Sequence, residues 1–176
     1  MKYFVGYLIQ GKTAKWHFNL VKNVSEKFNT FKLHERVFPH ITIFRPFETG
    51  DIDSIKGILR SWIKNKLIPG DFVISGFDHF GDKVVFAKVE INESVKETVK
   101  DLRRTIKRIS GMPYEEFPVW RPHVTLANHF SLEEFDKIWS YISNLKKPNF
   151  ILPFDNVTIF RLENNKKWVI EESLPH

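Results

Sequence analysis

The chain has 176 residues, 42% of them apolar and including 17 Phe and 5 Trp, so it can build the packed core of one domain. Its 27 Lys and Arg against 21 Asp and Glu give a net charge of +6, which favours anionic partners such as nucleic acid, nucleotides or phosphates but also serves solubility alone. The absence of cysteine excludes disulfides and thiolate metal sites. The sequence has neither a membrane-spanning run nor a signal-peptide cleavage site, so we expect a cytoplasmic protein.

The first half of the chain predicts five elements that alternate between strand and helix. In order they are a strand at 3–9, a helix at 13–31, a strand at 38–47, a helix at 51–66 and a strand at 72–80. Apolar residues at every fourth position from Trp16 to Phe28 indicate the first helix, and Asp51 is a suitable N-cap for the second.

The second half predicts the same order again. A strand at 83–91, a helix from 94 to about 109, a strand at 121–130 and a helix at 131–145 are followed by strands at 150–162 and 167–173. Ser94 with Glu97, and Ser131 with Glu134, have the spacing of capping boxes.

This repetition predicts an internal duplication. Tyr3 at the start of the first strand lies 37 residues before His40, and Val84 in the second copy lies 39 residues before His123. We therefore expect one bilobal α+β domain over residues 1–176, with pseudo-twofold repeat units at about 3–80 and 82–174. Its two antiparallel sheets would enclose a central cleft, with the helices outside.

Two copies of one short motif stand at equivalent points of the repeat. They are Pro39-His40-Ile41-Thr42-Ile43 and Arg121-Pro122-His123-Val124-Thr125-Leu126-Ala127. Residues two apart on a strand share a face, so each histidine shares a face with its threonine while the apolar residues face the core. A single copy would more often be an ordinary strand, but the paired copies indicate a site.

The residue types of this pair suit phosphoryl chemistry. One imidazole can take a proton from a nucleophile while the other gives a proton to a leaving group. The hydroxyls of Thr42 and Thr125 can bind the non-bridging oxygens of a phosphate. A strained cyclic phosphodiester would need no metal, and Arg45, Arg121 or Lys88 could help attract it.

The two motifs resemble those of the 2H phosphoesterase superfamily, which includes 2′-5′ RNA ligase and 2′,3′-cyclic phosphodiesterase proteins, and the resemblance extends over the whole chain in element order. It implies metal-independent hydrolysis of a 2′,3′-cyclic phosphate, or related cleavage or joining at 2′-5′ linkages. It also implies that His40 and His123 are catalytic and that Thr42 and Thr125 bind phosphate. Members often have a basic residue where this chain has Asn128, which bears on the choice of substrate.

Several further residues are candidates for substrate binding. By period two, His129 shares the face of His123 and could line the cleft, although a polar strand end is the simpler interpretation. Phe80, Phe44 and Trp120 could stack on a base, although packing in the core is the simpler interpretation for each. A zinc site from His40, His123 and His129 is a weak idea because each motif supplies one ligand.

The sequence therefore predicts a monomeric enzyme without metal, cofactor or membrane partner that acts on RNA or a nucleotide bearing a 2′,3′-cyclic phosphate. An RNA-end or nucleotide-binding protein with vestigial chemistry is an alternative, as is a 2′-5′ RNA ligase running the reverse reaction. The sequence does not reveal which histidine is the acid, or which ribose oxygen keeps the phosphate.

Overall fold

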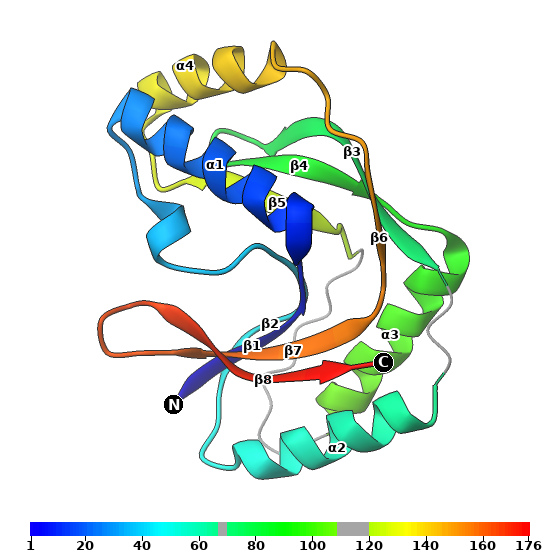
Figure 1. Cartoon of the computed structure of the whole chain (residues 1–176). Helices are drawn as coiled ribbons and strands as arrows, with labels where there is room; N and C mark the ends of the chain where they lie inside the picture. The colour runs from blue at the N-terminus through cyan, green and yellow to red at the C-terminus, as the bar shows by residue number, and fades with distance from the viewer. Residues whose placement is uncertain (67–69, 109–119) are drawn as a thin grey trace.

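Two antiparallel sheets of four strands form the framework, as expected for an α+β protein (Figure 1). The computed structural model describes residues 1–66, 70–108 and 120–176. The first sheet has the order β2 (His40–Glu48), β1 (Lys2–Leu8), β7 (Asn156–Leu162) and β8 (Trp168–Pro175). The second has the order β5 (His123–Asn128), β4 (Val84–Glu90), β3 (Asp71–Phe80) and β6 (Phe150–Pro153).

The helices lie outside the sheets, and two of them follow a strand of one sheet but pack on the other sheet (Figure 1). α1 (Gly11–Phe28) follows β1 of the first sheet yet packs on β5 and α4 (Leu132–Ser143) of the second. α3 (Glu93–Lys107) follows β4 of the second sheet yet packs on β2 and α2 (Ile52–Lys64) of the first. A short 3-10 helix, η1 (Leu33–Glu35), precedes β2. These crossings bind the two halves to each other.

The sheets also exchange strands, which the sequence did not predict. β3 comes from the first expected unit but belongs to the second sheet, while β7 and β8 come from the second unit but belong to the first sheet. The single strand expected at 150–162 is wrong: it is split into β6 and β7, which lie in different sheets. Pro153 cannot donate to a ladder, and the buried Phe154 leaves the strand to pack against Tyr7 and Phe72. The unit boundaries stay a prediction.

The helix caps agree with the sequence at two of three places. Asp51 accepts a hydrogen bond from the Ser54 amide at 3.1 Å, and Ser131 with Glu134 forms a complete capping box. The capping box expected at Ser94 is wrong because Asn92, two residues earlier, caps α3 by accepting from the Val95 amide at 2.8 Å. Residue 109, where this helix was expected to end, lies outside the described ranges.

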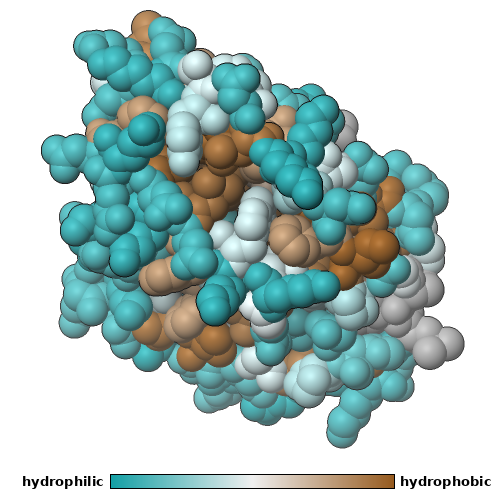
Figure 2. Space-filling model, turned by 45° about the horizontal axis from the view of Figure 1, so that its top comes forward, coloured by the Kyte–Doolittle hydropathy of each residue, from teal (hydrophilic) through white to brown (hydrophobic). Residues whose placement is uncertain are grey.

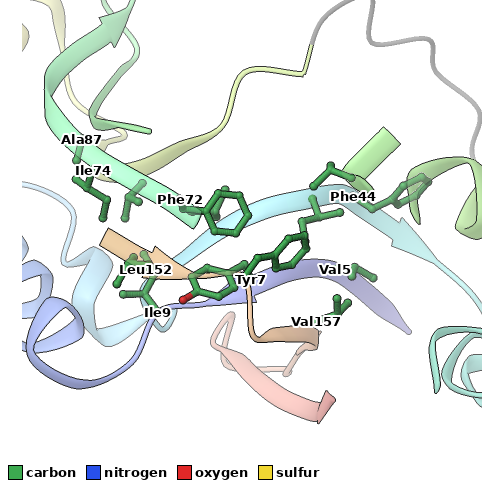
Figure 3. Packing of buried hydrophobic residues seen from close by; sticks show 14 of the residues in the cluster. Val5, Tyr7, Ile9, Phe44, Phe72, Ile74, Ala87, Leu152 and Val157 are labelled. Carbon is green, nitrogen blue, oxygen red and sulfur yellow. The ribbon is translucent and has the colours of Figure 1, made fainter. Parts of the chain in front are cut away.

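One hydrophobic core joins the two sheets. Phe72 of the second sheet points toward Tyr7 of the first, and their rings lie 4.8 Å apart, while Leu152 and Phe44 belong to the same cluster (Figure 3). This packing holds the sheets in one arrangement, on which the geometry of any site between them depends. Over the described part of the chain, no helix is both long enough and apolar enough to cross a membrane.

Candidate active site

The two strands that carry the His-x-Thr motifs, β2 and β5, have a register shift at the same position of the motif. His40 pairs with Leu8 and Thr42 with Gly6, just as His123 pairs with Lys88 and Thr125 with Phe86. One residue after each threonine the register shifts, so that Ile43 and Leu126 have no partner across the ladder. Such a β-bulge re-aims the residues that follow it. The duplication thus extends to backbone detail.

The bulge in β5 determines which later residues lie on the same face as Thr125, the face that borders the cleft between the two motif strands. Leu126 and Ala127 are both buried, so the alternation moves by one residue and Asn128 takes the face of Thr125. His129 lies beyond the strand with a left-handed φ of 56°, and its ring stands edge-on to Phe31 at 4.9 Å. Both Asn128 and His129 line the cleft. Two consecutive apolar residues after each threonine were the available sequence signal for the bulge.

A cleft of about 820 Å³ opens between the motif strands, and His40, Thr42 and Thr125 line it. Among the described residues that line it, Arg36 and Lys166 are cationic and none is a carboxylate, so the cleft favours an anion. Exposed Phe31 and Phe38 add apolar wall, and Figure 2 shows that such apolar patches lie between hydrophilic side chains on the surface. The remaining lining residues are Phe4, His17, Leu33, Val37, Pro46, Val124, Leu162 and Trp168.

The two motif histidines have the same hydrogen bond. Nδ1 of His40 lies 2.8 Å from the carbonyl oxygen of Phe38, and Nδ1 of His123 lies 2.8 Å from that of Arg121. A carbonyl only accepts, so in both rings Nδ1 carries the proton. Within the part of the chain that the structure describes, Nε2 of neither ring has a hydrogen-bond partner. Each neutral imidazole therefore offers Nε2 as a base.

Both rings rest on pairs of phenylalanines. His40 lies 4.7 Å from Phe4 and 5.4 Å from Phe160, and His123 lies at similar distances from Phe80 and Phe86. The apolar surroundings penalise the imidazolium form.

This burial lowers the pKa of His40 to about 4, and the charges of His17 and His123 contribute to that lowering. Burial also lowers the pKa of His123.

The expected substrate-binding residues divide between two places. Phe80, Lys88 and Arg121 line a smaller recess of about 310 Å³, whose wall includes Phe86 beside His123. Lys88 also faces His123 across the β4–β5 ladder. Arg45 lies half-buried in β2 and is not among the residues that line these two cavities, and neither is His123 itself.

Sequence reasoning missed three residues that support the motif strands. His17 of α1 donates from Nε2 to the Thr125 carbonyl at 2.7 Å, and Trp120 donates its indole N–H to the Thr42 carbonyl at 2.9 Å. The indole N–H of Trp120 thus bonds the protein backbone, while Trp120 also lines the smaller recess, so its stacking on a base stays a prediction. Gly6 faces Thr42, and a Cβ there would lie 2.9 Å from the Ile41 carbonyl oxygen. Only the tertiary fold reveals these roles, because the partners are far apart in sequence.

No metal-binding group stands out in the described ranges. Nowhere in residues 1–66, 70–108 and 120–176 do three or more His, Asp or Glu side chains gather closely enough to hold a metal ion. His40, His123 and His129 therefore do not form such a group.

Two sequence comparisons, with a family model and with individual proteins, each find proteins similar to this chain. Residues 13–166 match the sequence model of the 2′-5′ RNA ligase superfamily. A Staphylococcus aureus (strain Newman) protein named "Putative phosphoesterase" is 29% identical over 151 residues, covering 81% of this chain and 83% of the relative.

Three solved structures share the fold. TT0787 of Thermus thermophilus has a TM-score of 0.65 at 16% identity, covering 99% of this chain and 97% of its own. E. coli LigT complexed with 3′-AMP has a TM-score of 0.57 at 12% identity with the same coverage. Kluyveromyces marxianus Usb1 with uridine monophosphate has a TM-score of 0.51 at 12% identity, covering 99% and 98%.

Proposed function

Because this chain belongs to the 2′-5′ RNA ligase superfamily of 2H phosphoesterases, we propose that it hydrolyses 2′,3′-cyclic phosphates on RNA ends or small nucleotides. The observation that carries the proposal is the duplicated Nδ1–carbonyl bond of His40 and His123. It gives both rings the same tautomer and leaves Nε2 of each for proton transfer. Two related proteins of known structure were solved with 3′-AMP and uridine monophosphate, which supports a nucleotide ligand.

The reaction follows from these groups. One imidazole accepts a proton at Nε2 from the attacking water, and the other donates a proton from Nε2 to the departing ribose oxygen. The new P–O bond forms as the ring P–O bond breaks, which yields a phosphomonoester and a ribose hydroxyl. The hydroxyls of Thr42 and Thr125 donate to the non-bridging oxygens, where charge increases in the transition state. No step requires a metal, since ring strain activates the diester.

The apolar surroundings of His40 and His123 suit the roles of one ring as the base and the other as the acid. Burial lowers the pKa of both rings, so the base is neutral at neutral pH. A bound phosphate anion favours the charged form of a nearby imidazole and so raises its pKa. Binding of the substrate can thus supply the protonated acid. The described residues that line the cleft include no carboxylate that could replace the phosphate as counter-ion, whereas Asp78 lines the smaller recess.

The test is turnover of a panel of 2′,3′-cyclic nucleotides, cyclic-phosphate RNA ends and 2′-5′ dinucleotides, with identification of the products. H40A and H123A should each lower kcat by about 100-fold or more, and a chelator should change nothing. H176A is the matched control, because His176 also bonds a backbone carbonyl, that of Lys66, at the C-terminal end of β8 far from the motif strands. Near wild-type turnover by both motif variants would refute the assignment.

A second candidate activity is joining or cleavage at a 2′-5′ linkage, which the family match favours. The same two proton transfers run in reverse would join a cyclic phosphate to a hydroxyl. The panel separates this activity from hydrolysis by its products. Nucleotide binding without any product would favour the alternative of a binding protein with vestigial chemistry.

A further inference from the structure

The backbone carbonyls of Thr42 and Thr125 each accept a hydrogen bond from an aromatic ring in the other half of the molecule. Trp120 lies three residues before His123, yet its indole N–H donates to Thr42 of the opposite motif strand at 2.9 Å. His17 lies on α1, which follows β1 beside β2, yet its Nε2–H donates to Thr125 on β5 at 2.7 Å. Each bond therefore ties one motif strand to an element continuous with the other.

The two hydrogen bonds are made where the ladder between each motif strand and its own sheet is interrupted. Each accepting threonine directly precedes a bulge, at which the register with the neighbouring strand shifts. A bulge interrupts the ladder and bends the strand, so hydrogen bonds from outside the sheet gain importance there. Both donors are firmly held: His17 is only 4% exposed, and Trp120 packs against the core.

We propose that His17 and Trp120 are positioning residues that set the separation of the two His-x-Thr strands, and with it the placement of His40 and His123 about the phosphate. This inference rests on the proposed function. His17 lines the cleft and Trp120 lines the smaller recess, but the N–H of each is committed to a backbone carbonyl and is not available to bind the substrate. A displacement of about 1 Å between reacting groups can lower turnover by about 100-fold, so small movements of these strands matter.

The first test replaces Trp120 and compares it with a matched tryptophan. Trp62 also donates its indole N–H at 2.9 Å, but to Asp101 between α2 and α3 and not to a motif strand. W120F should lower kcat on a cyclic phosphate by about tenfold or more with KM changed less than about twofold. W62F removes an indole bond of the same length, to a carboxylate, and should leave both constants near wild type.

The second test replaces His17 in two ways. H17Q can place an amide N–H near the position of Nε2, whereas H17L offers no donor. Nδ1 of His17 is buried without a partner in the described structure, so H17L removes one unsatisfied polar atom while leaving the Thr125 carbonyl without its donor. Tm is therefore measured beside kcat for each variant. We expect H17L to lose kcat as W120F does, H17Q to retain most of it, and the double variant H17L/W120F to lose less than the product of the single losses.

Equal kinetics for W120F and W62F, or for H17L and H17Q, would overturn the inference, as would losses of kcat that only follow losses of Tm. If the wild-type protein turns over no cyclic phosphate, the proposed function fails and positioning is judged by NMR. The Trp120 indole proton is the peak that W120F lacks. Faster exchange of this proton in H17L than in H17Q supports coupling of the two bonds, and equal rates refute it.

Discussion

His17 should make the protein sensitive to mild acid. Burial lowers the pKa of this imidazole to about 4, against 6.5 for an ordinary histidine, and its hydrogen bond to Thr125 offsets only part of that effect. In the folded state the ring therefore stays neutral between these pH values, while in the unfolded chain it takes up a proton. The unfolded state binds more protons in this window, so stability is complete above pH 6.5 and falls as the pH falls toward 4.

The size of the effect follows from the same two values. A tenfold change in an equilibrium constant corresponds to about 1.4 kcal/mol, so the protonation of His17 in the unfolded chain lowers the free energy of unfolding by about 3 kcal/mol between pH 7 and pH 4. Since small domains are stable by roughly 5–15 kcal/mol, this is a large fraction of the total. Carboxylates with lowered pKa, such as those of Asp101 and Glu171, contribute to the same acid loss.

Comparison with variants isolates the histidine from those carboxylates. The free energy of unfolding would be measured with urea at pH 7, 5.5 and 4 for wild type, H17L and H17Q. Both variants lack the titrating ring, so both should lose about 3 kcal/mol less than wild type over this range, whatever their stability at pH 7. Parallel pH curves for all three proteins would show that His17 is not held neutral by the fold and would refute the reasoning.

Three other predictions concern the surroundings of the motif strands. Whichever motif histidine is the base, its lowered pKa should keep kcat/KM from falling until the pH is below 6.5, and an acid limb centred at or above 6.5 would contradict this. Asn156 is buried and bonds both the amide and the carbonyl of Leu8, at 2.9 and 3.0 Å, so N156A should cost about 2–4 kcal/mol in urea unfolding, and a cost below about 1 kcal/mol would argue against these bonds. G6A should lower both Tm and kcat, because the added Cβ would lie 2.9 Å from a backbone oxygen. G57A has open space around it in α2, so it should leave kcat unchanged and raise stability by up to about 1 kcal/mol. Equal behaviour of the two variants would refute the close approach at Gly6.

The sequence could predict the elements and the central pair because both depend on local patterns. Apolar spacing placed the helices and most of the strands, and the repeated Pro-His-x-Thr singled out the two histidines. The inward packing of Ile41, Ile43, Val124 and Leu126, at most 2% exposed, agrees with period two on the motif strands. Up to each threonine, alternation alone was a sufficient guide.

Beyond each threonine, alternation was not a sufficient guide. The bulges at Ile43 and Leu126 move the pattern by one residue, which brings Asn128 onto the cleft face. The strand expected at 150–162 failed for a related reason, since its two halves serve different sheets. Each of these outcomes depends on which neighbour a strand pairs with, and pairing is a long-range property.

The sequence by itself thus determined the order of the elements, the duplication and the chemical identity of the two paired motifs, because these are written in adjacent residues. Tertiary structure alone decided how the motifs are held. It placed β3 and β7 in opposite sheets, and it brought His17 and Trp120 to the carbonyls of Thr125 and Thr42 across 108 and 78 residues. The physical reason is that a hydrogen bond or a packed ring depends on proximity in space, which packing of the whole chain creates and no local pattern records.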